Sequence, residues 1–203
     1  MIVIAITGYK RCGKDTAAYL IRKNSNVSLD RYSFADPVRE VAMSFFGWSP
    51  SVFLDDLKEV VDPHWGISPR QALQFIGTEV GRVMMPKTFP EFNEKTGDSI
   101  WIKRFKNYIK DSIPEHAKGV TIPDMRFINE FNAVTDLSEE HKVITIAIER
   151  DGLKSDGHAS EDSIREVMDM CTYTIRNNGS IGDLERVTQN ILFEHDLLKF
   201  QSR

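Results

Sequence analysis

The sequence has few cysteines, no long apolar run and no excess of basic residues. Cys12 and Cys171 are the two cysteines among 203 residues, which excludes a framework of disulfide bonds. No apolar run approaches the roughly 20 residues that span a bilayer. The apolar opening, residues 1–6, is too short for the apolar core of a signal peptide, and no basic segment precedes it. These features predict a cytoplasmic protein that does not enter a membrane.

The charge balance argues against a nucleic-acid-binding protein, and the spacing of the histidines argues against a zinc site. Lysine plus arginine number 26 against 30 aspartate plus glutamate, a formal net charge of −4. A protein that coats nucleic acid needs a basic excess to neutralise phosphates, so no direct nucleic-acid partner is expected. The five histidines show no zinc-ligand spacing with each other or with the cysteines. Any phosphate chemistry must therefore come from a focused basic pocket.

Short apolar runs alternate along the chain with segments of helical periodicity. Residues 2–6 are apolar without polar alternation, which is typical of a strand buried on both faces. Alternating strands and helices indicate an α/β fold, a doubly wound parallel sheet with helices on both faces. The patterns predict strands over 2–6, 29–34, 119–124, 142–148 and 173–175, helices over 14–23, 37–46, 69–85, 100–113, 128–137 and 181–198, and irregular or loop segments over 48–68, 86–98 and 150–160.

A phosphate-binding pattern, G-x-x-x-x-G-K, occupies residues 8–14 between the first predicted strand and helix. Glycines let backbone N–H groups wrap around a phosphate, the helix N-terminus adds partial positive charge, and Lys14 reaches the β- and γ-phosphates. The pattern alone also fits a chance glycine-rich turn. The next residue is normally a serine or threonine that ligates Mg²⁺, but here it is Asp15, followed by Thr16. Either Asp15 holds the metal, directly or through water, or Thr16 contacts phosphate.

An acid and an arginine follow the predicted strand 119–124. Asp124 ends that strand and Arg126 comes two residues later. The carboxyl ends of strands face the ligand crevice of a doubly wound sheet. There Asp124 would be a group in the outer shell of a metal, a base or an acceptor for the substrate. Arg126 would bind a phosphate with its two-pronged guanidinium. The alternative is an ordinary turn aspartate and a surface arginine.

Polar side chains recur every fourth residue on the predicted helix 69–85. Arg70, Gln74 and Thr78 share one face of that helix and offer a guanidinium, an amide and a hydroxyl to a phosphorylated base. A solvated helix face explains the same pattern equally well. Arg39, near the start of the preceding helix, is a further candidate phosphate contact, with a solvated arginine as the alternative.

Taken together, these residues resemble the bacteriophage deoxynucleoside monophosphate kinases, which are P-loop nucleotide kinases. The Lys-Arg pair inside the loop and its Lys-Asp-Thr ending are much more specific than the general pattern, so Asp15 matches this family. The resemblance covers nearly the whole chain, as a single P-loop kinase domain over 1–203. It rests on residues 8–16 (GYKRCGKDT), 33–37 (SFADP), Arg70, Gln74, 77–79 (GTE), Trp101, 123–126 (PDMR), Arg150, 154–158 (KSDGH) and 177–180 (NNGS).

The resemblance implies transfer of the γ-phosphoryl group of ATP, with Mg²⁺, to a deoxynucleoside monophosphate, giving a diphosphate and ADP for phage DNA synthesis in the host bacterial cytoplasm. It implies a helical substrate-binding region over 36–113 and a lid loop over 150–161. Lys14, Arg126 and Arg150 would be catalytic, and Asp15 and Thr16 would hold the metal. The ATP site would comprise Lys10, Arg11, Gly13, Lys14, Asp15, Thr16, Ala17, Asn177 and Gly179. The monophosphate site would comprise Arg39, Arg70, Gln74, Gly77, Thr78, Trp101, Asp124, Arg126 and Glu130.

Two other functions stay open at this point. One is a different small-molecule P-loop kinase, resembling dephospho-coenzyme A or phosphomevalonate kinases, which share the loop and the lid. The other is a non-catalytic nucleotide-binding switch. The expected partners are small molecules, with no membrane. The sequence leaves open the accepted bases, the discrimination of deoxyribose from ribose, and a homodimer.

Overall fold

The structure is a computed structural model, and it describes residues 1–54, 56–96, 99–153 and 163–199. The chain forms two compact units. The first comprises residues 1–33 and 112–203, and the second comprises residues 34–111. The helical substrate-binding region expected over 36–113 overlaps the second unit. Of the lid loop expected over 150–161, residues 154–161 lie outside the described residues.

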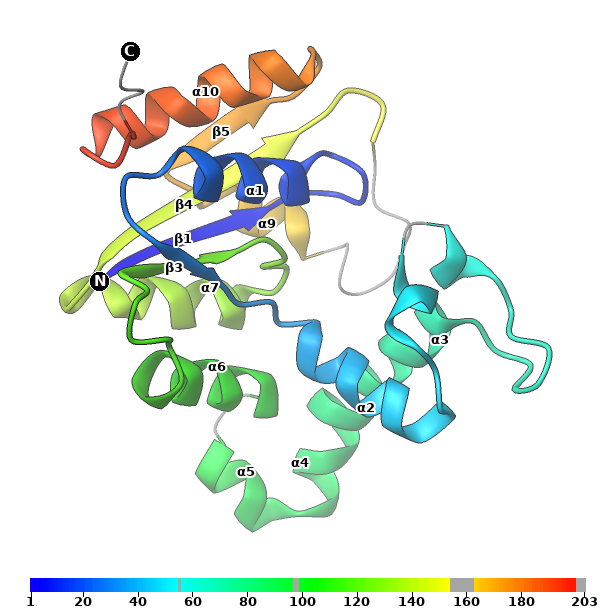
Figure 1. Cartoon of the computed structure of the whole chain (residues 1–203). Coiled ribbons are helices and arrows are strands. Elements are labelled where there is room, and N and C mark those ends of the chain that lie inside the picture. The colour runs from blue at the N-terminus through cyan, green and yellow to red at the C-terminus, as the bar shows by residue number, and fades with distance from the viewer. Residues whose placement is uncertain (55, 97–98, 154–162, 200–203) are drawn as a thin grey trace. The chain divides into compact units, whose positions relative to one another are not determined.

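The first unit is built on a parallel five-stranded sheet (Figure 1), with the order β2-β3-β1-β4-β5. β1 lies at its centre, where Ala5 pairs with Ile122 of β3 on one side and with Thr145 of β4 on the other. This confirms the predicted doubly wound α/β sheet. The strands are β1 (Ile2–Thr7), β2 (Leu29–Arg31), β3 (Gly119–Ile122), β4 (Lys142–Glu149) and β5 (Tyr173–Arg176).

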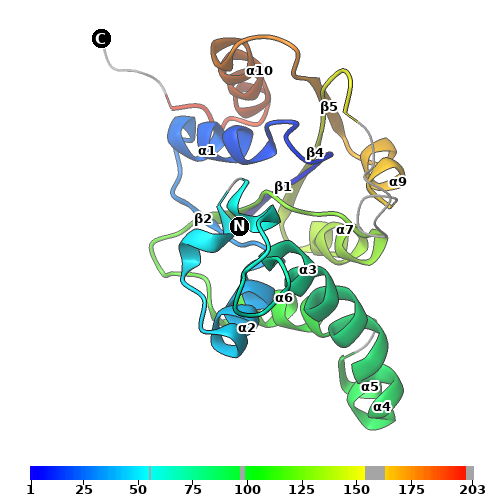
Figure 2. The same cartoon turned by 90° about the vertical axis from the view of Figure 1, so that its right-hand side faces the viewer.

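Helices cover both faces of this sheet (Figures 1 and 2). Ile4, Ile6 and Ile146 point to one face, where they share a core with the helices α1 and α10. Ala147, the neighbour of Ile146 on β4, points to the other face and packs against Ile164 of α9. Burial on both faces explains why the strands are apolar without alternation. The helices of this unit are α1 (Lys14–Asn24), α7 (Ile128–Thr135), the 3₁₀ turn η4 (Asp136–Glu139), α9 (Ile164–Asp169) and α10 (Ile181–Glu194).

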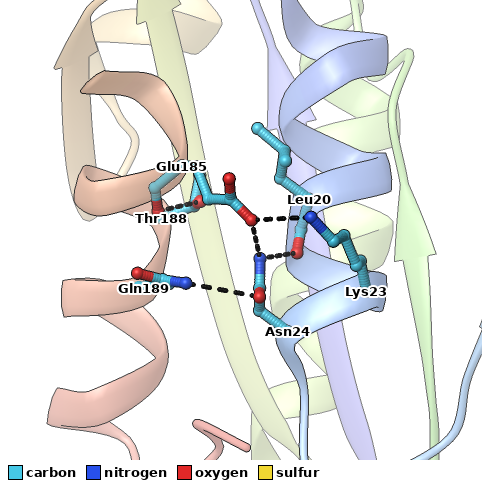
Figure 3. Close-up of polar contacts among 6 residues, drawn as sticks. All are labelled: Leu20, Lys23, Asn24, Glu185, Thr188 and Gln189. Atoms are coloured by element: carbon cyan, nitrogen blue, oxygen red, sulfur yellow. Dashed lines mark hydrogen bonds and ion pairs between the residues drawn. The ribbon is translucent and has the colours of Figure 1, made fainter. Parts of the chain in front are cut away.

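A polar network joins the C-terminal end of α1 to α10 (Figure 3). Asn24 donates from its side-chain amide to the carbonyl of Leu20 at 2.9 Å and to the carboxylate of Glu185 at 3.0 Å. Lys23 donates to the same carboxylate oxygen at 3.0 Å, and Gln189 donates to the Asn24 carbonyl oxygen at 3.3 Å. The network holds α1, the helix that follows the phosphate-binding pattern, against α10.

The second unit is helical. α2 has Pro37 in its first turn and ends just before Gly47, whose φ of 67° is the left-handed conformation that glycine adopts readily. α3 begins at a capping box, in which the Ser68 hydroxyl accepts from the Gln71 amide. The elements are α2 (Asp36–Phe46), the 3₁₀ turns η1 (Pro50–Phe53) and η2 (Leu57–Glu59), α3 (Pro69–Gln74), the π-helical segment η3 (Phe75–Met84), α4 (Met85–Thr88), α5 (Pro90–Thr96) and α6 (Ile100–Asp111).

Several predicted boundaries were wrong. The expected loop 86–98 is mostly helical, because Pro86 and Pro90 stand in the first turns of α4 and α5, where a proline's missing N–H costs nothing. The predicted strand 29–34 ends at Arg31, and the predicted final helix ends at Glu194. The short helix α9 was not expected at all. In the described part of the chain, no helix is long and apolar enough to cross a membrane.

Candidate active site

The loop between β1 and α1 needs its two glycines because other groups approach its backbone closely. A Cβ on Gly8 would lie 2.5 Å from the carbonyl oxygen of Ile148 and 2.6 Å from the sulfur of Cys12. A Cβ on Gly13, whose φ is 101°, would meet the side-chain nitrogen of Asn177. The spacing of the pattern therefore follows from the packing of the loop against β4 and the segment after β5.

Lys14 is buried, with 6% of its surface exposed. Its ammonium group donates to the carbonyl of Tyr9 at 3.2 Å, and it forms no ion pair within the described part of the chain. A buried ammonium that faces a neutral carbonyl instead of a carboxylate gains by binding an anion. The Lys14 ammonium group is thus a positive charge held against the backbone of the loop.

The first turn of α1 adds backbone donors beside this charge. The first helical hydrogen bond runs from the Ala17 amide to the Gly13 carbonyl at 2.9 Å. The amides of Lys14, Asp15 and Thr16 precede that bond and stand at the positive end of the helix. Together with the lysine, they form the donor arrangement that binds phosphate groups at helix N-termini.

The candidate metal ligands Asp15 and Thr16 lie in this same turn. The Asp15 carboxylate is exposed and makes no hydrogen bond or ion pair with the described residues. No group of three or more His, Cys, Asp or Glu residues that could hold a metal occurs in the described ranges. Mg²⁺ does not need such a cage, since it binds through one or two carboxylates, substrate phosphates and waters. The oxygen donors of Asp15 and Thr16 fit that chemistry.

The Cys12 thiol lies inside the loop and is buried. Burial raises the pKa of this thiol, against the opposing effect of the Lys14 charge. A thiol that stays protonated is a poor nucleophile. Cys12 therefore serves the packing of the loop, where its carbonyl also accepts a hydrogen bond.

The end of β3 brings Asp124 to the same edge of the sheet as the loop. The Met125 amide donates to the carbonyl of Ile6 in β1 at 3.2 Å, which fixes the backbone just after Asp124. The hydroxyl of Ser33, which follows β2, donates to the Asp124 carboxylate at 2.6 Å. Ser33 belongs to the motif at 33–37, but sequence reasoning gave it no role, since no local pattern pairs it with Asp124.

Glu130 shapes the turn that carries Arg126. Its buried carboxylate accepts from the Arg126 amide at 2.8 Å and from the Phe127 amide at 3.2 Å, at the start of α7. The expectation placed Glu130 at the monophosphate. The structure shows its carboxylate engaged with the backbone that presents Arg126.

The segment after β5 holds the loop from its other side. Asn177 donates from its side chain to the Cys12 carbonyl at 2.8 Å, and its backbone amide donates to the carbonyl of Glu149 at 2.8 Å. Gly179 lies so close to Asp183 that a Cβ there would be 2.7 Å from its carboxylate. In the described part of the chain, the exposed guanidinium of Arg150 has no hydrogen bond or ion pair.

In the second unit, Arg70, Gln74 and Thr78 follow one another along α3 and η3. The guanidinium of Arg70 lies 3.5 Å from the carboxylate of Glu59, and 17% of the Arg70 side chain is exposed. The side chains of Gln74 and Thr78 are partly exposed and form no hydrogen bond with described residues. The change to π-helical winding at Phe75 was not predicted from the sequence.

Trp101 and Gly77 are joined by a hydrogen bond. The indole N–H of the buried Trp101 donates to the Gly77 carbonyl at 2.8 Å, and Arg82 donates to the same oxygen at 2.8 Å. A Cβ on Gly81 would lie 2.7 Å from the indole ring, so this side of η3 rests on Trp101. The side chain of Arg39 forms an ion pair with Asp36.

No protein-family model matches the chain. A protein of Acanthamoeba polyphaga mimivirus named "Putative deoxynucleotide monophosphate kinase" is 31% identical over 173 residues, which cover 82% of this chain and 84% of the relative. This relative comes from a mimivirus and not from a bacteriophage, so the resemblance of this chain to bacteriophage kinases in particular stays a prediction.

Three solved kinase structures are similar at low sequence identity. They are shikimate kinase from Aquifex aeolicus (10% identical, covering 96% of both chains, TM-score 0.44), dephospho-CoA kinase from Campylobacter jejuni (15%, 96% of this chain and 98% of the other, 0.44) and thymidylate kinase from Candida albicans (12%, 99% and 96%, 0.43). With TM-scores this low, these structures do not bear on the substrate. The phosphate-binding loop on a parallel sheet and the relative that spans most of the chain together show that this protein is an ATP-dependent phosphotransferase of the P-loop nucleotide kinase family.

Proposed function

We propose that this kinase transfers the γ-phosphoryl group of ATP to a deoxynucleoside monophosphate, giving a deoxynucleoside diphosphate and ADP. The observation that carries the proposal is the buried Lys14 ammonium, which faces a neutral carbonyl in a phosphate-binding loop. The substrate class is supported by the mimivirus relative, which is named for deoxynucleotide monophosphates. Such a reaction would supply precursors for DNA synthesis.

On the donor side, Lys14 and the first-turn amides of α1 would bind the β- and γ-phosphates of ATP. Lys10, Arg11 and the backbone at Gly13 would add contacts from the loop. Asp15 and Thr16 would hold Mg²⁺, which when bound neutralises charge on the phosphates. The Asn177 bond to the Cys12 carbonyl would keep the loop in its curved form.

On the acceptor side, phosphoryl transfer breaks the bond between the γ-phosphorus and its bridging oxygen and forms one to an oxygen of the monophosphate. This reaction needs positioning and charge neutralisation more than covalent chemistry from the protein. Asp124 would orient the acceptor, while Arg126 and Arg150 would neutralise the transferring group. Arg39, Arg70, Gln74 and Thr78 would bind the monophosphate, as the resemblance implies.

A coupled assay of ADP release tests this proposal. The purified chain is mixed with ATP and Mg²⁺ and, in separate reactions, with each deoxynucleoside monophosphate, each ribonucleoside monophosphate or dephospho-coenzyme A. We expect ADP release that depends on at least one deoxynucleoside monophosphate. ADP release with dephospho-coenzyme A alone would instead identify a different small-molecule kinase.

A further inference from the structure

A short hydrogen bond joins two residues that follow neighbouring strands. Ser33 comes two residues after the end of β2, and Asp124 comes two residues after the end of β3. The Ser33 hydroxyl donates to the Asp124 carboxylate at 2.6 Å, across 91 positions of the sequence. Only 1% of Ser33 is exposed, so bulk water does not compete for this hydroxyl. A hydroxyl that donates to a carboxylate at this distance makes a charge-assisted bond.

The backbone on either side of this pair is held by the sheet and not by the hydroxyl. The Tyr32 amide, next to Ser33, donates to the Thr121 carbonyl at 3.0 Å. The Met125 amide, next to Asp124, donates to the Ile6 carbonyl at 3.2 Å. Loss of the hydroxyl should therefore leave the two chain segments in place. What it removes is the hydrogen bond to one oxygen of the Asp124 carboxylate, a group whose terminal torsion has broad minima.

We infer that Ser33 is a positioning residue, which holds the Asp124 carboxylate in the orientation needed for phosphoryl transfer. The inference rests on the proposed function, in which Asp124 orients the acceptor. Groups that hold a reacting side chain by hydrogen bonds act on the rate through its geometry. Ser33 is also the last residue of the first unit before the chain enters the second unit at Phe34. The hydrogen bond thus ties the end of this segment of the first unit to Asp124 of the same unit.

The first test compares Ser33→Ala with Ser25→Ala. Ser25 is also buried, and its hydroxyl accepts a single bond from the Val27 amide at 3.3 Å, at the end of α1 far from the phosphate loop. For Ser33→Ala we expect kcat to fall about 10-fold, a loss typical of a residue that orients another. The KM for ATP and for the monophosphate should stay near the wild-type values. Ser33→Thr keeps a hydroxyl and should recover part of kcat, and Ser25→Ala should leave kcat unchanged.

The second test asks whether the effect passes through Asp124. In an Asp124→Ala background there is no side-chain oxygen for Ser33 to hold, and adding Ser33→Ala should change kcat less than about twofold. An equal loss in both backgrounds would overturn the inference. So would a Ser33→Ala enzyme with wild-type kcat, or one in which only KM rises.

A crystal structure of Ser33→Ala gives a readout that needs no substrate. We expect the Asp124 carboxylate to rotate away from its wild-type orientation while the backbone at Met125 stays in place. An unmoved carboxylate would contradict the positioning role even if no deoxynucleoside monophosphate proves to be a substrate. Conversely, a rotated carboxylate in an enzyme that ignores deoxynucleoside monophosphates would refute the proposed function and keep the Ser33–Asp124 relationship.

Discussion

The side-chain amide of Asn177 donates a hydrogen bond of 2.8 Å to the backbone carbonyl of Cys12, 165 positions earlier in the sequence. This bond ties the turn after β5 to the middle of the phosphate-binding loop. The same amide nitrogen leaves no room for a side chain at Gly13. The curve of the loop therefore depends on a residue close to the other end of the chain.

Replacing this amide with a carboxylate should disturb ATP binding. In Asn177→Asp the donor is lost and a negative charge faces the Cys12 carbonyl, beside the site proposed for the phosphates. We expect the KM for ATP to rise roughly 10-fold, because a neutral hydrogen bond of about 1 kcal/mol is lost and a repulsive charge is added, with the monophosphate KM nearly unchanged. Asn26→Asp is the matched control, because the Asn26 side chain also donates to a distant carbonyl, that of Asp196, at 3.0 Å. A KM for ATP that rises equally in both variants would contradict this role.

Lys14→Ala should remove the charge that matters most in the transition state. We expect kcat to fall about 100-fold or more, because removing one preorganised donor to a developing charge has an effect of this size. The protein should still fold, as judged by circular dichroism. Lys23→Ala removes another lysine of the same helix, at its far end, and serves as the control. Near wild-type turnover in Lys14→Ala would show that the loop does not bind the transferred phosphate.

Asp15→Asn distinguishes a metal ligand from a helix cap. If the carboxylate holds Mg²⁺, directly or through water, the loss of its charge should raise the Mg²⁺ midpoint of turnover, and high Mg²⁺ should restore activity in part. Asp15→Ser, whose hydroxyl can ligate Mg²⁺, should retain more activity than Asp15→Ala. If Asp15 only caps α1, the Mg²⁺ midpoint stays the same and only the melting temperature falls, by an amount equivalent to about 0.3–1 kcal/mol.

Arg70→Ala should act on the acceptor. The guanidinium is paired with Glu59 at 3.5 Å, and a phosphate would be a stronger partner because it carries more negative charge than a carboxylate and also accepts two parallel hydrogen bonds. We expect the KM for the monophosphate to rise roughly 10- to 100-fold, with the KM for ATP little changed. Arg104→Ala is the control, since Arg104 is an exposed arginine of the same unit that pairs with Glu40. Equal weakening of both substrates by Arg70→Ala would remove α3 from the acceptor site.

The α1–α10 network gives a pH-dependent stability. Hydrogen bonds from Asn24 and Lys23 hold the pKa of Glu185 below its ordinary value of 4.5. A carboxyl group with a lowered pKa stabilises the fold fully above its ordinary pKa, and the contribution is lost as the pH falls through the folded value. The melting temperature of the wild type should therefore exceed that of Glu185→Gln near neutral pH, and the difference should shrink below about pH 4.5.

The control for this comparison is Glu166→Gln, because the exposed Glu166 carboxylate makes no hydrogen bond or ion pair in the described part of the chain. A difference between wild type and Glu185→Gln that stays constant from neutral to acidic pH would show that the network contributes nothing through this charge.

Local patterns predicted the sheet and its loop well. The unalternating apolar residues of β1, followed at once by Gly8, Gly13 and Lys14, predict a buried strand and a phosphate-binding turn without any knowledge of the rest of the fold. The acid after β3 was placed correctly at the carboxyl edge for the same reason. Each of these features depends on residues close together in the sequence.

Other features depend on distant partners and could not be predicted in this way. Ser33 contacts Asp124, and Asn177 contacts Cys12, only because the parallel sheet places the carboxyl ends of its strands side by side. Pro86 and Pro90 were interpreted as loop residues, although proline starts a helix as readily as it ends one. The buried carboxylate of Glu130 likewise accepts from the backbone of the turn at Arg126, and the spacing of apolar residues in the sequence does not predict this contact.

The central claim is tested most directly by following the phosphoryl group itself. ATP carrying a radioactive label on its γ-phosphate is incubated with the chain, Mg²⁺ and each deoxynucleoside monophosphate, and the products are separated by chromatography. The account predicts label in a deoxynucleoside diphosphate, formed in equal amount with ADP and absent with Lys14→Ala. Label that appears only as inorganic phosphate, or that stays on ATP with every deoxynucleoside monophosphate, would contradict it.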